Sequence, residues 1–207
     1  MWLNILTCLL CAYLLGNLNG SVCISALMHD DVRSHGSGNA GLTNFIRNYG
    51  VGRAALVILI DAGKAVVACL TGGLLLAPFG FWQEGVMLAG CAVLLGHDFP
   101  ALLGFRGGKG ILSGLFVALV ADWRIALILL AVFAIVYFAT RYVSLGSVLA
   151  AAAFGVGFAL FHWGASFVVA AGIFMAALTI FMHRSNILRL IKGNERKTDL
   201  FKKGNNT

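Results

Sequence analysis

Continuous apolar runs constrain the fold of this chain more than any other feature. They lie at roughly 4–28, 54–77, 84–103, 111–121, 125–139, 146–161 and 164–182. A helix needs about 20 apolar residues to cross a hydrocarbon core about 30 Å thick. Hydrophobic residues make up 60% of the 207 residues and charged residues only 11%, which is more apolar material than a soluble core requires. The sequence therefore predicts an all-α, polytopic integral membrane protein with about seven transmembrane helices.

Other membrane architectures fit the runs less well. A transmembrane barrel would show short segments of alternating apolar and polar residues, and these runs are continuous. The runs at 111–121 and 125–139 are short for a full crossing, so tilted or partly interfacial helices remain the alternative for those two. The first run has no positively charged n-region before it, which is typical of a retained span and not of a cleaved signal peptide.

The basic residues predict how the chain is oriented. Lys and Arg gather in three places, which we call the first (about 29–53), second (about 97–110) and third (about 183–197) polar segments. Because basic loops stay in the cytoplasm, seven spans put all three segments on the cytoplasmic face, the N-terminus outside and the C-terminus inside. The net charge of +7 is then mainly a topology signal, and the tail faces anionic lipid headgroups. We expect no nucleic-acid partner, because no basic stripe carries interleaved aromatic residues.

The first polar segment has the composition of an anion site. It contains Gly36-Ser37-Gly38-Asn39-Ala-Gly41-Leu-Thr43-Asn44-Phe-Ile-Arg47. Glycines permit positive φ and let backbone N–H groups converge on one point. The hydroxyl and amide side chains add donors, and the Arg47 guanidinium suits a phosphate group.

The second polar segment contains Gly107-Gly108-Lys109-Gly110. A nucleotide-binding P-loop needs a glycine six residues before the Lys and a Ser or Thr after it, but Leu103 and Gly110 stand there. Flexible backbone amides beside a Lys still suit a phosphate. The alternative interpretation is a basic turn at the membrane face.

Several titratable residues leave two interpretations open. His183 and Asn186 share a helical face, which favours a site, whereas Glu195 is either part of it or a solvated charge. His97 is either a helix-end residue or a functional one. Asp61 and Lys64 lie three residues apart inside an apolar run, where they form a structural pair or line a polar cavity.

Common catalytic signatures are missing. None of the five histidines begins a His-x4-Asp motif, and no Gly-x-Ser-x-Gly elbow occurs on a strand-to-helix turn. No residue cluster has metal-ligand spacing, so we expect neither a metal nor a cofactor.

The three segments together resemble the bacterial acyl-phosphate:glycerol-3-phosphate acyltransferases, the PlsY family. The resemblance covers nearly the whole chain. It rests on the ordered motifs above, on Gly96-His97-x-x-Pro100, and on His183-Arg184-x-Asn186-Ile187-x-Arg189-Leu190-x-x-Gly193-x-Glu195. The motif Arg141-Tyr-Val-Ser144-Leu-Gly-Ser147 is also similar to the family. The chain departs from the family where Ala40 replaces the usual Pro and Leu42 the usual Ala. Neither departure removes a charged or catalytic-type side chain.

This resemblance implies one acyltransferase domain over residues 1–207 in the bacterial inner membrane. Its reaction moves a fatty acyl group from acyl phosphate to the 1-hydroxyl of sn-glycerol 3-phosphate, without a cofactor and in functional coupling to an enzyme that makes acyl phosphate. The implied catalytic residues are Ser37, His183 and Asn186, with His183 either orienting the hydroxyl or acting as its base. The implied phosphate-binding residues are Gly36, Gly38, Asn39, Thr43, Asn44, Arg47, Gly107, Gly108, Lys109 and Gly110. The supporting residues are His97, Arg141, Ser144 and Glu195.

A transporter or channel for small organic anions is the alternative from another functional class. It would use the same basic, glycine-rich half-site, and transporters often contain inverted repeats. The sequence has no convincing internal repeat and only one face rich in polar motifs, which favours the enzyme.

Overall fold

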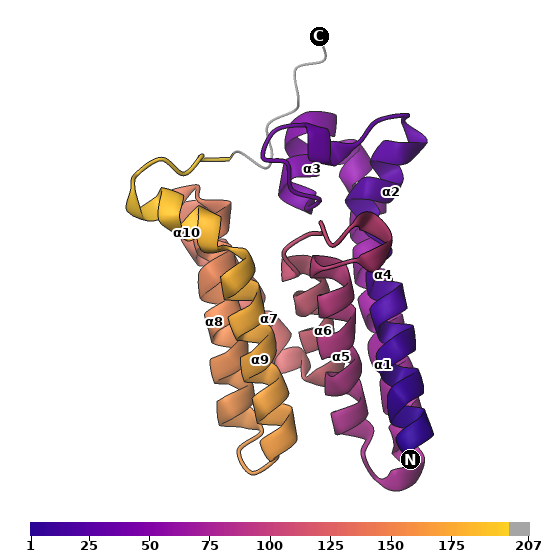
Figure 1. Cartoon of the computed structure of the whole chain (residues 1–207). Helices are drawn as coiled ribbons and strands as arrows, with labels where there is room; N and C mark the ends of the chain where they lie inside the picture. Colours follow the sequence, from indigo (N-terminus) through magenta and orange to yellow (C-terminus); the bar gives the residue numbers. More distant parts are fainter. Residues whose placement is uncertain (199–207) are drawn as a thin grey trace.

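The computed structural model describes residues 1–198, which form helices and turns without strands (Figure 1). The α-helices are α1 (Trp2–Gly16), α2 (Gly20–Leu27), α3 (Leu42–Tyr49), α4 (Val51–Leu76), α5 (Trp82–Asp98), α6 (Ile111–Ala121), α7 (Trp123–Thr140), α8 (Val143–Phe161), α9 (Ser166–Met182) and α10 (Arg184–Ile191). Short 3-10 turns are η1 (Val32–Ser34), η2 (Ala77–Phe79) and η3 (Ala101–Leu103). The predicted all-α membrane fold is confirmed.

The predicted apolar runs all fall on helices. Four helical spans are long and apolar enough to cross a membrane, namely α4 with η2, α5 with η3, α7 and α8. The bent pairs α1–α2 and α9–α10 raise the number to six if each pair is one span. The 11 residues of α6, at about 1.5 Å each, cover only about half of a hydrocarbon core. The count of seven crossings and the orientation of the ends stay predictions.

The first run differs from the continuous span predicted at 4–28. The helix breaks after Gly16 and resumes at Gly20 with a bend of 43° between α1 and α2. Two asparagines stabilise the break. Asn17 accepts a hydrogen bond from the backbone N–H of Leu102 at 3.0 Å, and Asn19 caps α2 by accepting from Val22 N–H at 3.1 Å. Their short amide side chains compete with helical backbone hydrogen bonding, which the apolar pattern alone did not reveal.

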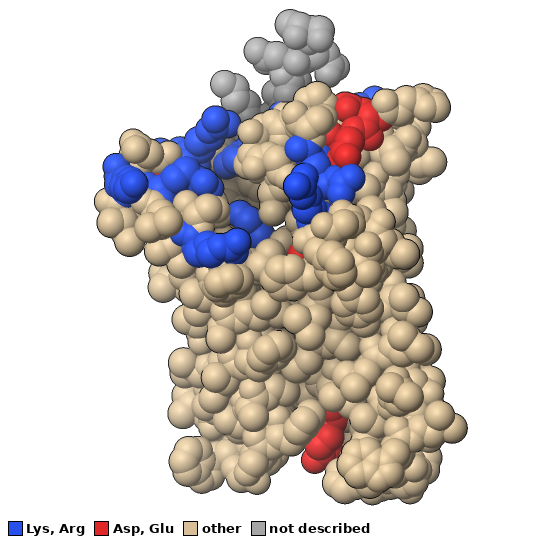
Figure 2. All heavy atoms as spheres, in the orientation of Figure 1, with Lys and Arg blue, Asp and Glu red and all other residues tan. Residues whose placement is uncertain are grey.

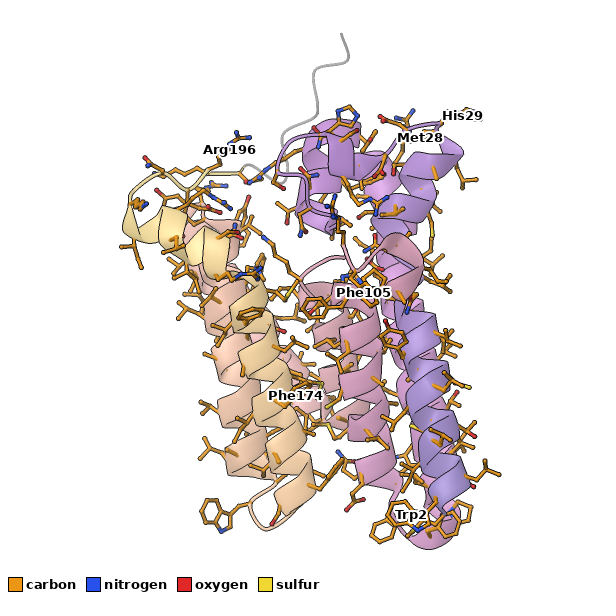
Figure 3. All side chains as sticks on the ribbon, in the orientation of Figure 1. Trp2, Met28, His29, Phe105, Phe174 and Arg196 are labelled. Atoms are coloured by element: carbon orange, nitrogen blue, oxygen red, sulfur yellow. The ribbon has the colours of Figure 1, made fainter. Side chains whose placement is uncertain are left out.

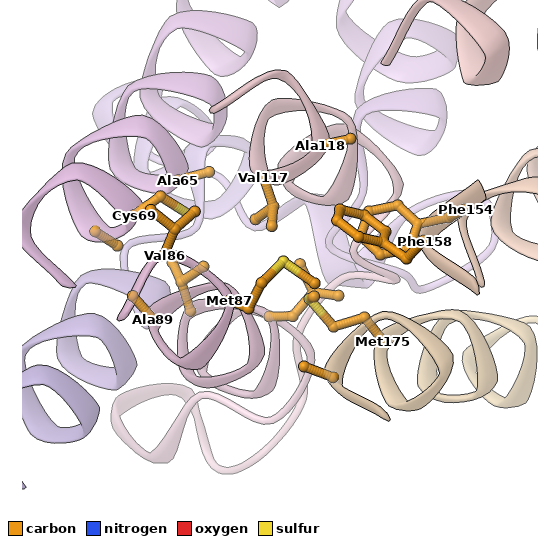
Figure 4. Close-up of a cluster of buried hydrophobic side chains, with 14 of the residues drawn as sticks. Ala65, Cys69, Val86, Met87, Ala89, Val117, Ala118, Phe154, Phe158 and Met175 are labelled. Atoms are coloured by element: carbon orange, nitrogen blue, oxygen red, sulfur yellow. The ribbon is translucent and has the colours of Figure 1, made fainter. Parts of the chain in front are cut away.

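The helices form two packed groups (Figure 1). One group contains α1, α4 and α5, and the other contains α7, α8 and α9, with α6 contacting both. Glycines allow a close crossing of α4 and α5: a Cβ added to Gly72 would lie 2.3 Å from the carbonyl oxygen of Gly85. Met87, Val117 and Met175 lie in the buried cluster where the two groups meet (Figure 4).

The two ends of the molecule differ in chemistry. The three polar segments lie at the same end, where Lys and Arg gather around a hollow (Figure 2). The chain's four tryptophans lie at the starts of α1, α5 and α7 and in the α8–α9 turn, which is the opposite end (Trp2 in Figure 3). Tryptophan is enriched at membrane–water interfaces, so this end has the composition expected at one boundary of the bilayer.

Candidate active site

A cavity of about 550 Å³ lies between the two helix groups and receives residues from all three polar segments. Its polar wall includes Arg47, Lys109 and Arg189. Its remaining wall is apolar and includes Leu115, Phe133, Phe154, Met175 and Leu94. The site therefore joins cationic groups to a surface that suits a hydrocarbon chain.

The loop of the first polar segment is organised by one buried side chain, Asn44. Its Nδ2 donates to the carbonyl oxygens of Val32, His35 and Asn39 at 3.0, 3.1 and 3.0 Å. Its Oδ1 accepts from the backbone N–H of Ser37 at 3.0 Å. The sequence analysis placed Asn44 among the phosphate-binding residues. In the structure, its amide forms hydrogen bonds within the loop and holds the loop in shape. Ser37 stays exposed at the cavity wall.

Gly107 and Gly108 pack against His97 and do not line the cavity. A Cβ on Gly107 would lie 2.0 Å from the carbonyl oxygen of His97, and one on Gly108 would lie 2.1 Å from His97 Nε2. The backbone N–H of Gly108 also donates to that carbonyl at 3.0 Å. Their predicted role in direct phosphate approach stays a prediction, and the structure adds a packing reason for both glycines, because His97 leaves no room for a side chain. Gly110 does line the cavity, with a φ of 71° just before α6.

The third polar segment is organised by Glu195, which is nearly buried. Its Oε1 accepts from Ser144 Oγ at 2.8 Å and from Asn186 Nδ2 at 2.7 Å, and its Oε2 accepts from Arg189 Nε at 2.7 Å. Burial alone would raise the pKa of Glu195, but these three donors hold it below its ordinary value. The alternative of a solvated tail charge is therefore wrong.

Two contacts connect the polar segments across the cavity. Lys109 Nζ donates to Asn186 Oδ1, and Arg47 donates through Nη2 to Thr198 Oγ1. Burial, with repulsion from Arg189, lowers the pKa of Lys109 to about 8. The Lys109 ammonium thus lies in an environment that favours a bound anion.

The hydrogen bonding of His183 fixes its neutral tautomer. Nδ1 lies 2.8 Å from the carbonyl oxygen of Thr179. Because a carbonyl oxygen only accepts, Nδ1 carries the hydrogen and Nε2 keeps its lone pair. His183 lines the cavity, so its ring can accept a proton or a hydrogen bond from a hydroxyl group there.

Asp61 and Lys64 form a buried ion pair with an Oδ1–Nζ distance of 2.9 Å. Asp61 also accepts from Gly20 N–H at 3.1 Å, and Lys64 donates to the carbonyl oxygens of Gly16 and Leu18. The pair therefore ties the α1–α2 break to α4. Asp61 additionally lies at the cavity wall, so both interpretations left open by the sequence apply to it.

Most of the predicted site residues meet at the cavity. Those that line it are Gly36, Ser37, Asn39, Thr43, Asn44, Arg47, His97, Lys109, Gly110, Ser144, His183, Asn186 and Glu195. Gly38 and Arg141 do not. Gly38 has a φ of 70° and shapes the loop, whereas the exposed Arg141 accepts Thr198 N–H at 3.0 Å through its backbone oxygen.

Other cavity residues were missing from the predicted set. Ser147 and Arg189 belong to the motifs that carried the resemblance, so their pattern offered a signal. Thr179 lies in an apolar run, and nothing local identifies it as the partner of His183. Across residues 1–198, no group of three or more His, Cys, Asp or Glu side chains has the arrangement of a metal site.

Comparison with known proteins identifies the family. The family model described as glycerol-3-phosphate acyltransferase matches residues 6–193, which is most of the chain. The chain belongs to the glycerol-3-phosphate acyltransferase family. A relative of that name from Thermoanaerobacter sp. (strain X514) is 40% identical over 187 residues, covering 90% of this chain and 91% of the relative. One from Neisseria gonorrhoeae (strain FA 1090) is 36% identical over 90% of this chain and 93% of its own length.

Solved structures of the same family share the fold. A crystal structure of PlsY, an integral membrane glycerol 3-phosphate acyltransferase, in its glycerol 3-phosphate form, is similar with a TM-score of 0.85. It is 33% identical in sequence, and the match covers 96% of this chain and 99% of that one. The lysophosphatidic acid form has a TM-score of 0.82, and the match covers 95% and 96%. This member of the glycerol-3-phosphate acyltransferase family is thus a multi-pass membrane protein, as its sequence predicted.

Proposed function

We propose that this protein transfers a fatty acyl group from acyl phosphate to the 1-hydroxyl of sn-glycerol 3-phosphate. The products are 1-acylglycerol 3-phosphate and inorganic phosphate. The observation that carries the proposal is one cavity with a cationic wall, at Arg47 and Lys109, and an apolar wall, at Phe154 and Met175. A phosphorylated acceptor and a phosphorylated lipid-like donor need those two surfaces together.

The membership of the chain in the family supports the acceptor. The related structure in its glycerol 3-phosphate form has the same fold, and the form with lysophosphatidic acid matches the expected product. Ser37, Arg47 and Lys109 are the side chains assigned to phosphate. Hydrogen bonds from cationic groups to phosphate oxygens are among the strongest in proteins.

The reaction needs little covalent chemistry from the protein. The acceptor hydroxyl oxygen attacks the acyl carbonyl carbon, an ester bond forms, and the carbon–oxygen bond to phosphate breaks. The electron pair leaves with the phosphate, whose oxygen takes up the hydroxyl proton. A phosphate monoester has its second pKa near 6, so such a group is a competent acceptor at neutral pH. Positioning and charge stabilisation then supply most of the acceleration.

His183 and Asn186 are assigned to the hydroxyl and the acyl carbonyl. The free lone pair of His183 Nε2 suits acceptance of the hydroxyl hydrogen. Asn186 is held on one side by Glu195 and on the other by Lys109, so its amide orientation is fixed. A preorganised amide of this kind contributes to catalysis without reorganising during the reaction.

The sequence favours acyl phosphate as the donor. The chain has no His-x4-Asp motif of the common thioester-dependent acyltransferases. A mixed anhydride supplies a good leaving group, which suits a site that relies on positioning. We place the protein in the bacterial inner membrane and in functional coupling to an enzyme that makes acyl phosphate, because this donor is reactive and lipid-like.

Phosphate release from acyl phosphate, with and without glycerol 3-phosphate, tests the proposal. Purified protein in detergent should release phosphate and form 1-acylglycerol 3-phosphate only when both substrates are present. Robust turnover with acyl-CoA, in preparations free of acyl phosphate, would contradict the donor assignment. Flux of the intact anion across liposomes without turnover would instead favour a transporter.

A further inference from the structure

A buried chain of polar side chains leads from the helix break to the second polar segment. Asp61 Oδ1 lies 2.9 Å from Lys64 Nζ, and Lys64 Nζ lies 2.7 Å from His97 Nδ1. All three side chains are at most 6% exposed. Buried charges and imidazoles are costly to desolvate unless they have partners, and here each of the three side chains has one.

The contact with Lys64 decides which nitrogen of His97 carries hydrogen. An ammonium group only donates, so Nδ1 must accept with its lone pair. The neutral ring therefore keeps its hydrogen on Nε2. This is the opposite tautomer from that of His183, whose Nδ1 donates to Thr179.

The Nε2 atom of His97 lies against the loop that carries Lys109. A Cβ on Gly108 would come within 2.1 Å of it, so only glycine leaves room there. His97 lines the cavity together with Lys109 and Gly110. Within the described chain, no residue accepts a hydrogen bond from Nε2. His97 Nε2 is thus a hydrogen-bond donor of fixed position that has no acceptor among the described residues.

We infer that His97 donates a hydrogen bond from Nε2 to an oxygen of the bound phosphorylated substrate, and that Asp61 and Lys64 are positioning residues that fix this donor. The inference rests on the proposed function for the identity of the ligand. Lys64 locks the tautomer, and Asp61 holds Lys64 in place. The glycine at 108 lets the ring reach the loop.

The tautomer itself can be measured without any reaction. Side-chain 15N NMR of histidine-labelled protein, with the His97 signal assigned by its loss in His97→Gln, should show an unprotonated Nδ1 and a protonated Nε2. The double variant Asp61→Asn/Lys64→Met removes both charges together and leaves no unpaired buried ion. Its His97 should lose the fixed tautomer while its thermal unfolding stays cooperative. A protonated Nδ1 in the wild type would overturn the inference.

Two amide variants of His97 distinguish the position of the hydrogen-bond donor from the size of the side chain. In His97→Gln the amide nitrogen lies near the position of Nε2, whereas in His97→Asn it lies near that of Nδ1. Binding of radiolabelled glycerol 3-phosphate should weaken about tenfold or more in His97→Asn, as expected for a lost hydrogen bond to a charged group. The loss in His97→Gln should be smaller than threefold. Equal losses in the two variants would overturn the inference.

Binding and turnover assays of the wild type distinguish a failure of this inference from a failure of the proposed function. If the wild type neither binds glycerol 3-phosphate nor releases phosphate from acyl phosphate, the proposed function fails, whatever the tautomer. If the wild type catalyses the reaction and His97→Gln and His97→Asn lose affinity for glycerol 3-phosphate equally, only the role of His97 fails. The variant His162→Ala, at the opposite end of the molecule, serves as the control for handling and folding.

Discussion

Lys109 donates a hydrogen bond through Nζ to Oδ1 of Asn186, which lies 77 residues further along the chain. Asn186 in turn donates to Glu195 Oε1 at 2.7 Å. A cation of the second polar segment is therefore held by an amide of the third, and a buried carboxylate orients that amide. A bound phosphate would meet Lys109 already positioned, which reduces the entropy lost on binding.

The ionisation of Lys109 predicts how activity depends on pH. Because burial lowers its pKa to about 8, the ammonium form dominates below that pH and is lost as the pH rises above it. We expect kcat/KM for glycerol 3-phosphate to fall above about pH 8, since this parameter reports the free enzyme. Lys109→Arg keeps its charge through pH 10 and should abolish the decline, even if its absolute rate is lower. An unchanged pH profile in Lys109→Arg would contradict the assignment.

Glu195 should be needed for both stability and catalysis. Glu195→Ala removes the acceptor of Ser144, Asn186 and Arg189 at once. A hydrogen bond to a charged group contributes about 1.5–3 kcal/mol, so we expect kcat/KM to fall by roughly tenfold or more. Thermal unfolding and steady-state kinetics measure the two effects. Glu84→Ala, in the first turn of α5 at the far end, should change neither.

His183 and His162 form a matched pair for testing the third polar segment. His183 lines the cavity, whereas His162 bonds Asp122 at the opposite end, with Nε2 3.1 Å from Oδ2. His183→Ala should chiefly depress kcat, by about 10²-fold if the ring is a general base. His162→Ala should keep kcat near that of the wild type. Equal behaviour of the two variants in folded protein would mean that the third segment is structural.

The variant His183→Gln distinguishes the two roles proposed for the imidazole. Glutamine can hydrogen-bond to the hydroxyl but cannot accept its proton near neutral pH. Substantial activity in this variant would support proton transfer to the phosphate of the donor. A loss as large as in His183→Ala would assign the base to His183.

Gly108→Ala should disturb the loop through His97. The added methyl group would lie 2.1 Å from Nε2, so the ring or the loop must move, at a cost of about 1–3 kcal/mol. We expect a lower unfolding temperature and a higher KM for glycerol 3-phosphate. Gly63→Ala is the control, because a Cβ there meets nothing within 4 Å outside its own helix. Similar unfolding temperatures for both variants would contradict the packing argument.

The predicted orientation can be tested by labelling introduced cysteines in sealed cells. Trp163 is 90% exposed in the α8–α9 turn, at the end predicted to lie outside. An impermeant thiol reagent should label Trp163→Cys and should miss Ser37→Cys and Lys197→Cys. Labelling of Ser37→Cys from outside would overturn the seven-span topology.

The sequence by itself determined the fold class and predicted most of the polar residues that line the cavity. Apolar runs of bilayer length leave helices as the only way to satisfy the backbone in lipid, so the all-α fold followed from composition and run length. The small polar segments that interrupt the runs identified Ser37, Lys109 and His183, because such residues have no packing role in hydrocarbon. The break at Asn17–Asn19 escaped detection, because the apolar pattern continues across it.

Only the tertiary structure decided which polar residues line the cavity and which of them hold the surrounding loops in place. The amide of Asn44 is of a type that binds phosphate, but it donates instead to the carbonyl oxygens of Val32, His35 and Asn39. The sequence pattern does not predict that these three residues surround Asn44. Gly108 was expected to approach phosphate, but its missing side chain makes room for His97, and Lys64 selects the tautomer of that ring from 33 residues away. Hydrogen-bond partners and close contacts of this kind depend on which helices pack together. Periodicity and spacing along the chain specify each helix. The packing between helices determines which side chains face the cavity and which hold other residues in place.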